Sequence, residues 1–83
     1  MAEASDEPLD GVRLAPDGRP RSFRRRGRLW RVSRVAEVWK DAGCWWEGEG
    51  EKTFFRLETD GSRLVEIYLD PVAGKWFLYR VYD

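Results

Sequence analysis

The sequence contains no histidine and only one cysteine, Cys44. Histidine is the commonest general base and a frequent metal ligand, and a lone cysteine forms neither an intrachain disulfide nor a zinc site. We interpret Cys44 as a partly buried loop residue. These absences exclude the common catalytic and metal centres. We therefore expect a protein that is not an enzyme, holds no metal or cofactor, and depends on packing for its stability in a reducing compartment.

Long apolar runs are also missing, since no stretch approaches the roughly 18 residues of a membrane span. Residues 1–10 hold four acidic side chains and no basic one, unlike the basic start of a signal peptide. With Pro8 and little apolar content, this segment is typical of a disordered acidic tail. We expect a cytoplasmic protein without membrane contact, with residues 1–10 as the tail and residues 11–83 as a single β domain.

One segment of the chain lacks acidic residues and another lacks basic residues, so the charges are unevenly distributed even though the formal net charge is zero. Residues 19–34 contain eight arginines and no acid, whereas residues 41–51 contain four acids and no base. The glycines at 48 and 50 do not form a phosphate loop, because the neighbouring carboxylates repel phosphate. The sequence therefore predicts a basic patch that faces or flanks a solvated acidic loop.

Turn residues divide the first half of the chain. Residues 12–14 have the composition of a short edge strand, and the Pro-Asp-Gly triplet at 16–18 is a turn signal. The segment from Phe23 to Trp30 is interpreted as a hairpin with Arg26 and Gly27 at its tip. This register places Phe23 opposite Trp30 as a cross-strand aromatic pair. It also gathers four arginines, Arg24, Arg25, Arg26 and Arg28, at one end of the hairpin.

Residues 29–40 allow two interpretations. Val32, Val35 and Val38 favour a strand by propensity, but Val32, Val35, Ala36 and Trp39 also fit the spacing of a helix. Alternation of apolar and polar residues fails near residues 33–34, so a strand would need a bulge there. A bent strand is the favoured interpretation and a helix is the alternative.

The second half contains three β runs, at residues 52–59, 62–70 and 75–82. Asp60-Gly61 is the strongest short hairpin signal, and a two-residue turn there pairs Leu57 with Leu64 and Glu58 with Arg63. This register places Phe54, Val65, Ile67, Leu69, Trp76 and Leu78 on one face. It places Phe55, Leu57, Leu64, Tyr68, Phe77, Tyr79 and Val81 on the other.

Both faces of this meander are apolar, so a flat sheet with one wet face does not fit. We expect an all-β fold, a small curled antiparallel sheet or partly open barrel of five to six strands built from hairpins. Either the meander itself curls into a small barrel or the N-terminal hairpin covers one of its faces. In the alternative, one aromatic face stays open for a partner.

The second half also carries a family resemblance. The segments that carry it are Trp45-Trp46-Glu47-Gly48, Phe54-Phe55-Arg56-Leu57-Glu58, Asp60-Gly61, Leu64 and Gly74-Lys75-Trp76-Phe77-Leu78. Together with the stretch from Phe23 to Val32, they resemble a bacterial domain of unknown function. Copies of that domain look similar to the C-terminal end of catalytically inactive Y-family DNA polymerase homologues of the ImuB type, in the damage-inducible mutasome. The resemblance implies a setting in translesion synthesis or DNA repair and no catalytic residue.

Two binding hypotheses follow for this module. In the first, a protein partner is bound by aromatic anchors at Trp39, Trp45 and Trp46 and by the arginine hairpin, since these residue types dominate interface hot spots. A homodimer that joins the acidic loop to the basic hairpin is one version of it. In the second, nucleic acid is bound by phosphate contacts and exposed rings. The candidate contact residues are Arg24, Arg25, Arg26, Arg28, Arg31, Trp39, Trp45 and Trp46.

Overall fold

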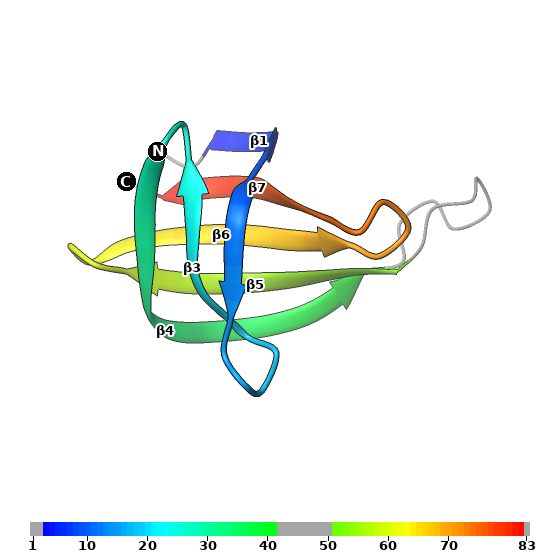
Figure 1. Ribbon diagram of the computed structural model, residues 1–83, viewed down its shortest axis with the longest axis horizontal. Helices are drawn as coiled ribbons and strands as arrows, with labels where there is room; N and C mark the ends of the chain where they lie inside the picture. Colours follow the sequence, from blue (N-terminus) through cyan, green and yellow to red (C-terminus); the bar gives the residue numbers. More distant parts are fainter. Residues whose placement is uncertain (1–2, 42–50, 83) are drawn as a thin grey trace.

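The computed structural model describes residues 3–41 and 51–82, and every secondary-structure element in these ranges is a β-strand (Figure 1). Seven antiparallel strands form one sheet in the order β1-β7-β6-β5-β4-β3-β2. The strands are β1 Glu3–Pro8, β2 Asp10–Leu14, β3 Pro20–Arg25, β4 Arg28–Asp41, β5 Lys52–Thr59, β6 Arg63–Asp70 and β7 Lys75–Tyr82. The described part of the chain contains no helix able to cross a membrane.

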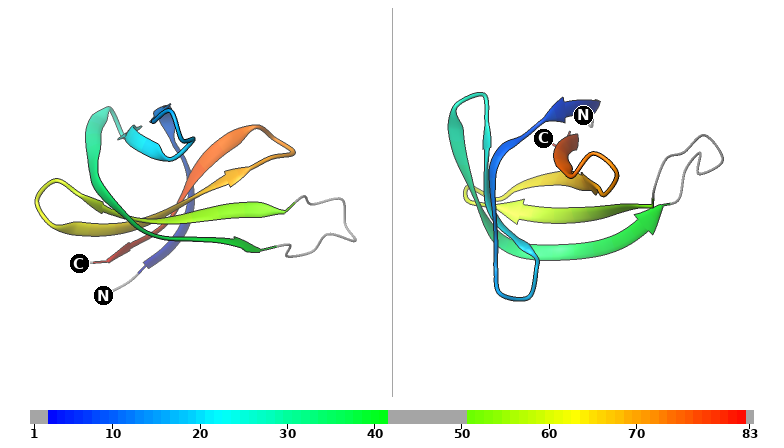
Figure 2. Two further views of the ribbon diagram at one scale, coloured as in Figure 1. Left: turned by 90° about the horizontal axis from the view of Figure 1, so that it is seen from below. Right: turned by 45° about the vertical axis from the view of Figure 1, so that its right-hand side comes forward.

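The sheet curls into a nearly closed barrel. Strands β1 and β2 follow one another in the chain, yet they lie at opposite ends of the strand order. Their common bend therefore brings the two sheet edges toward each other, as the two views in Figure 2 show. This confirms the prediction of a curled sheet or partly open barrel, with seven strands in the described ranges instead of five to six.

The long strand β4 makes the curl possible. Its first part pairs with β3, its second part pairs with β5, and its pairing register shifts between Val32 and Arg34 and again between Val35 and Glu37. A bulge bends a strand and increases its twist. The bulge predicted at residues 33–34 is thus confirmed, and the helical alternative for residues 29–40 is wrong.

The acidic N-terminal segment is ordered from Glu3 to Pro8, so the prediction of a disordered tail is wrong for these residues. They form β1 and pair with β7. Leu9 follows with only 8% of its surface exposed, and its amide donates a hydrogen bond of 3.0 Å to the carbonyl oxygen of Trp76. The segment is polar, but its strand pairs with an edge of β7 that would otherwise be open, and Leu9 is buried. These two contributions stabilise the strand despite its polar composition.

The core lies inside the curl. Phe23, Leu57, Val65 and Ile67 are fully buried and Leu78 is nearly so, while Leu9, Trp30 and Phe55 complete the cluster. Phe23 and Trp30 come from the hairpin β3–β4, which therefore covers the inner face of β5, β6 and β7 (Figure 2). Each buried side chain of this size contributes about 1.5–3 kcal/mol to the free energy of unfolding. The predicted cover by the N-terminal hairpin is confirmed.

The predicted register between β5 and β6 is wrong by one residue. Leu57 pairs with Val65 and Thr59 pairs with Arg63, so the loop has three residues, Asp60, Gly61 and Ser62. Gly61 (φ 85°) and Ser62 (φ 61°) both adopt positive φ, and the Ser62 amide donates to the Thr59 carbonyl at 3.1 Å. Ser62 adds the third loop residue that the two-residue Asp-Gly prediction omitted.

A slip of one residue moves side chains to the other face of a sheet. Phe55 and Leu57 therefore point into the core with Val65 and Ile67, whereas Phe54 lies on the outer face beside Tyr68. The pairing of β6 with β7 also shifts by one residue. Glu66 pairs with Arg80 but Ile67 pairs with Leu78, so Tyr79 is an extra residue that forms a bulge in β7. The predicted faces are therefore wrong for the β5 residues and for Val81, which packs against the core. The prediction that Val65, Ile67 and Leu78 share one face is confirmed.

Candidate functional site

A row of side chains crosses the three N-terminal strands. Arg13 of β2 pairs with Ser22 of β3, which in turn pairs with Arg31 of β4. Neighbouring strands lie about 4.8 Å apart, so the two arginine backbones are separated by roughly 10 Å with a small hydroxyl residue between them. The adjacent row contains Asp10, Arg24 and Leu29. Cross-strand register thus collects cations from three strands on one surface.

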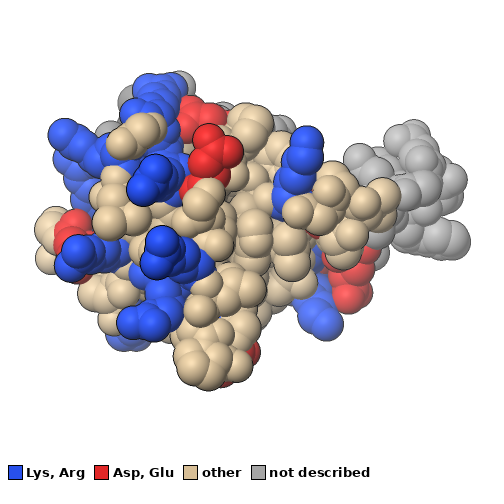
Figure 3. Space-filling view, in the orientation of Figure 1, with Lys and Arg blue, Asp and Glu red and all other residues tan. Residues whose placement is uncertain are grey.

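These rows line a shallow hollow of about 1180 Å³ over β2, β3 and the first part of β4, which we call the arginine groove. The charged residues that line it are Arg13, Arg19, Arg21, Arg24, Arg31 and Arg34, with Asp10 and Asp17. In the space-filling view, Lys and Arg gather where β3 and the first part of β4 lie (Figure 3). The predicted basic patch therefore exists, and it extends beyond the hairpin to β2.

Few of these arginines are neutralised. Arg19 contacts Asp17 at 3.8 Å, and Arg34 forms an ion pair with Glu58. Within the described ranges, six arginines have no ion pair or hydrogen bond through their guanidinium groups: Arg13, Arg21, Arg24, Arg28, Arg31 and Arg63. Of the predicted contact residues, Arg24, Arg28 and Arg31 therefore remain available to a partner.

The hairpin tip has a different role. Arg26 (φ 53°) and Gly27 (φ 75°) form the two-residue turn predicted from the sequence, with Arg25 paired to Arg28. Arg25 and Arg26 each contact the carboxylate of Glu7 at 3.1 Å. These two predicted contact residues thus hold β1 against the hairpin and help to close the barrel.

The aromatic residues of the hairpin are not available for base stacking. Phe23 and Trp30 pair as predicted, with ring centroids 5.8 Å apart, but their exposed fractions are 0% and 9%. Their place in the core leaves neither ring exposed for stacking on a nucleobase. Among the residues that the structure describes, no aromatic side chain lines the arginine groove.

A second aromatic group lies on the outer face of β4–β7 and was not predicted because of the register error. Trp39 stacks on Phe54 at 5.4 Å, Phe54 contacts Tyr68 at 5.1 Å, and Tyr68 stacks on Phe77 at 5.3 Å. Since these rings cover one another's faces, Trp39 belongs to a packed cross-strand ladder. The other predicted anchors, Trp45 and Trp46, lie outside the described residues.

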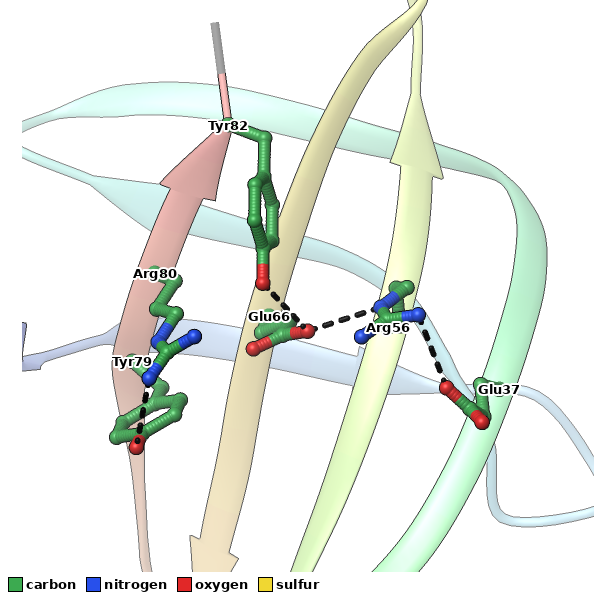
Figure 4. A network of polar contacts seen from close by, with 6 residues as sticks. All are labelled: Glu37, Arg56, Glu66, Tyr79, Arg80 and Tyr82. Carbon is green, nitrogen blue, oxygen red and sulfur yellow. Dashed lines mark hydrogen bonds and ion pairs between the residues drawn. The ribbon is translucent and has the colours of Figure 1, made fainter. Parts of the chain in front are cut away.

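Charges on this outer face neutralise one another (Figure 4). Arg56 contacts Glu37 at 3.0 Å and Glu66 at 2.9 Å, and the Tyr82 hydroxyl donates to Glu66 at 3.1 Å. The hydrogen bond to Glu66 is the main cause that raises the pKa of Arg56 above its ordinary value. Hydrogen bonds with Tyr82 and then Tyr79 raise the pKa of Arg80.

The acidic segment at 41–51 is described only at its ends. Glu51 lies 3.8 Å from Lys40, so its described contact is with β4 rather than with the hairpin. The rest of the predicted acidic loop falls outside the described residues, as does Cys44. In the described ranges, no three carboxylate, thiol or imidazole side chains come together as metal ligands would.

Sequence reasoning did not identify Arg13 and Arg63 as surface candidates. Arg13 reaches the groove because β2 pairs with β3, and Arg63 lies 5.5 Å from the Trp30 ring. The turn at residues 16–18 was a usable signal for Arg13, since it folds β2 back onto β3. Arg63 had no such local signal.

Comparison with known proteins gives one match. A family model described as "Domain of unknown function (DUF6504)" matches residues 5–83. No curated protein and no solved structure matches the chain. The family match begins within β1 and covers its last four residues, 5–8, and it provides no link to polymerase homologues.

Proposed function

The chain belongs to the DUF6504 family of domains of unknown function, and on that premise we propose that it is a non-catalytic module that binds the phosphate backbone of nucleic acid. One observation carries the proposal. Four arginines of the groove, Arg13, Arg21, Arg24 and Arg31, have no carboxylate partner in the described ranges. Guanidinium groups bind phosphate oxygens in a bidentate manner, which favours this class of ligand.

The groove favours backbone contacts over base stacking. The described part of its lining contains no aromatic side chain, whereas non-specific single-strand binders combine a basic groove with stacking rings. Duplex DNA has the higher density of phosphate charge and offers a regular row of phosphates. The proposed ligand is therefore a duplex, bound with little dependence on its sequence.

Salt dependence tests this proposal. If the four groove arginines each neutralise one phosphate, the logarithm of the affinity falls with the logarithm of the salt concentration at a slope of about −3.6. Between 50 and 200 mM salt this corresponds to a loss of about a hundredfold. Fluorescence anisotropy of a labelled duplex, with a single strand of equal length beside it, measures the slope.

Substitution identifies the surface that is responsible. The paired variant Arg13→Gln and Arg31→Gln should lower duplex affinity and reduce the salt slope by about 2. Lys75→Gln is the matched control, because it also removes positive charge but lies at the exposed start of β7, outside the groove. Absence of duplex binding at 50 mM salt, or equal effects of both changes, would overturn the proposal.

An acidic protein partner is the second candidate. Two exposed leucines favour it: Leu14 and Leu29 both line the groove and are each 49% exposed. Apolar anchors beside arginine are typical of protein interfaces. A double change to serine should leave duplex binding unaltered. It should weaken binding of a defined acidic peptide if the groove serves a protein.

The proposed setting is a bacterial DNA transaction, such as repair or translesion synthesis, in the cytoplasm. Its support is the resemblance of residues 45–48 and 74–78 to the C-terminal end of inactive Y-family polymerase homologues, together with a surface suited to DNA. Partners that fit this setting are duplex DNA, a protein of the same assembly, or a second copy of the chain. Sedimentation with and without duplex distinguishes the homodimer from the other two.

A further inference from the structure

We propose that a second hollow, between the start of β4 and the β5–β6 turn, binds a single phosphate group. We call it the turn pocket; its volume is about 510 Å³. The residues that matter are Arg28, Trp30, Arg31, Asp60, Gly61 and Arg63. The source of the phosphate, a nucleic-acid strand end, is inferred from the proposed function. The pocket itself does not depend on that proposal.

Three arginines and one aspartate are among the residues that line this pocket. Arg28 and Arg31 have no carboxylate partner in the described ranges, and neither has Arg63, whose guanidinium carbon lies 5.5 Å from the centre of the Trp30 ring. Asp60 is the one acidic residue of the lining. The local charge therefore favours an anion.

The backbone around the pocket is fixed before any ligand arrives. The Asp60 amide donates to the carbonyl oxygen of Arg31 at 3.0 Å, which ties the turn to β4. The Thr59 hydroxyl donates to the carbonyl oxygen of Arg63 at 3.2 Å. Trp30 forms a buried wall beneath the arginines. Little ordering of the backbone is needed on binding, which favours affinity for a small ligand.

The number of donors favours phosphate over carboxylate. Each guanidinium presents a planar set of N–H donors that matches two phosphate oxygens, and three such groups suit a tetrahedral group with several charged oxygens. Arg31 lines both the turn pocket and the arginine groove. A strand in the groove can therefore place its terminal phosphate in the turn pocket.

Titration with inorganic phosphate tests the pocket alone. Backbone and indole N–H resonances of the full chain are followed by NMR as phosphate replaces chloride at constant ionic strength. We expect saturable shifts at Gly61, Arg63 and the Trp30 indole. Shifts that fail to saturate, or that are absent from these residues, would overturn the proposal.

Variants sharpen this test. Arg28→Gln should weaken phosphate binding about tenfold, because it removes a charge-assisted contact. Arg28 is exposed, so this change should leave the fold intact, while Arg63→Lys keeps the charge above Trp30 and should lose only the bidentate contact. Asp60→Asn removes the opposing carboxylate and should tighten binding severalfold. Lys75→Gln should have no effect, and an equal response of all four variants would contradict a specific pocket.

Oligonucleotides then separate the two sources of phosphate. A duplex with a 5′-phosphate should bind about tenfold more tightly than the same duplex with a 5′-hydroxyl, and Arg28→Gln should abolish the difference. If inorganic phosphate saturates the pocket but the two duplexes bind equally, the pocket stands and its ligand is a free phosphate compound. If duplexes bind with the expected salt slope but neither form of phosphate reaches the pocket, this inference fails and the proposed function remains.

Discussion

At the scale of single residues, the two outer surfaces of the barrel differ in how their charges are compensated. Glu66 is only 2% exposed, and its carboxylate accepts hydrogen bonds from Arg56 and Tyr82. In the groove, by contrast, Arg13 and Arg31 have no such partner among the described residues. Compensation within the fold is the sign of a structural role, and its absence among the described residues supports the proposal that the groove binds an anionic partner.

This distinction predicts unequal costs for two arginine substitutions. Arg56→Met should lower the free energy of unfolding by more than Arg34→Met does, because it leaves the buried carboxylate of Glu66 without its cation. Arg34→Met breaks an exposed pair with Glu58 and should cost less than about 1 kcal/mol. Urea denaturation of both variants measures the difference, and equal costs would contradict it.

The pH dependence of that prediction follows from the pKa of Arg56. Its pKa is raised in the folded protein, so the associated stability is fully present at lower pH and is lost only as the pH rises through the raised value, far in the alkaline range. The Arg56→Met difference should not decline between pH 6 and pH 9. A decline over this range would assign the effect to another group.

At the scale of elements, the β5–β6 turn decides which residues form the core. Ser62 is a third loop residue in the left-handed conformation, and without it Asp60 and Gly61 form the two-residue turn that hairpins favour. Deletion of Ser62 leaves Thr59 opposite Arg63, so the register and the faces are retained. We expect the free energy of unfolding to change by less than about 1 kcal/mol.

Deletion of Gly61 is the matched control. It produces a loop of the same length, but Asp60 and Ser62 must then adopt positive φ without a glycine, which costs about 1–2 kcal/mol. Thermal melting and near-UV circular dichroism compare the two deletions. Loss of the native aromatic signal on deletion of Ser62 would show that the third loop residue is essential to the register.

The same turn shows what the sequence could and could not predict. The tip at Arg26 and Gly27, the bulge near residues 33–34 and the three C-terminal strands each have a local signal, and all were predicted correctly. Two-residue and three-residue loops both contain Asp-Gly, so the register was not determined locally. The side chains that complete the arginine groove come from β2. The position of β2 depends on closure of the whole barrel, which has no local signal in the sequence.

At the scale of the whole molecule, the arginines that close the barrel are neighbours of those that line the groove. Glu7 of β1 contacts both Arg25 and Arg26, while the neighbouring Arg24 belongs to the groove. Both outermost strands, β1 and β2, have register shifts, which protect exposed sheet edges from pairing with other chains. Closure therefore depends on a few contacts, of which the Glu7 carboxylate is the central one.

Glu7→Gln should consequently change stability and binding in opposite directions. Loss of the half-buried pair with Arg25 should lower the free energy of unfolding by about 1 kcal/mol, since the partners are only partly screened from water. Release of Arg25 and Arg26 should tighten duplex binding and steepen the salt slope by about 1 to 2. Glu51→Gln is the control, because it releases only Lys40, which lies outside the groove, and does not touch β1. Weaker duplex binding by Glu7→Gln, despite an intact fold at the temperature of the assay, would show that a closed barrel matters more to the groove than the charge of the hairpin tip.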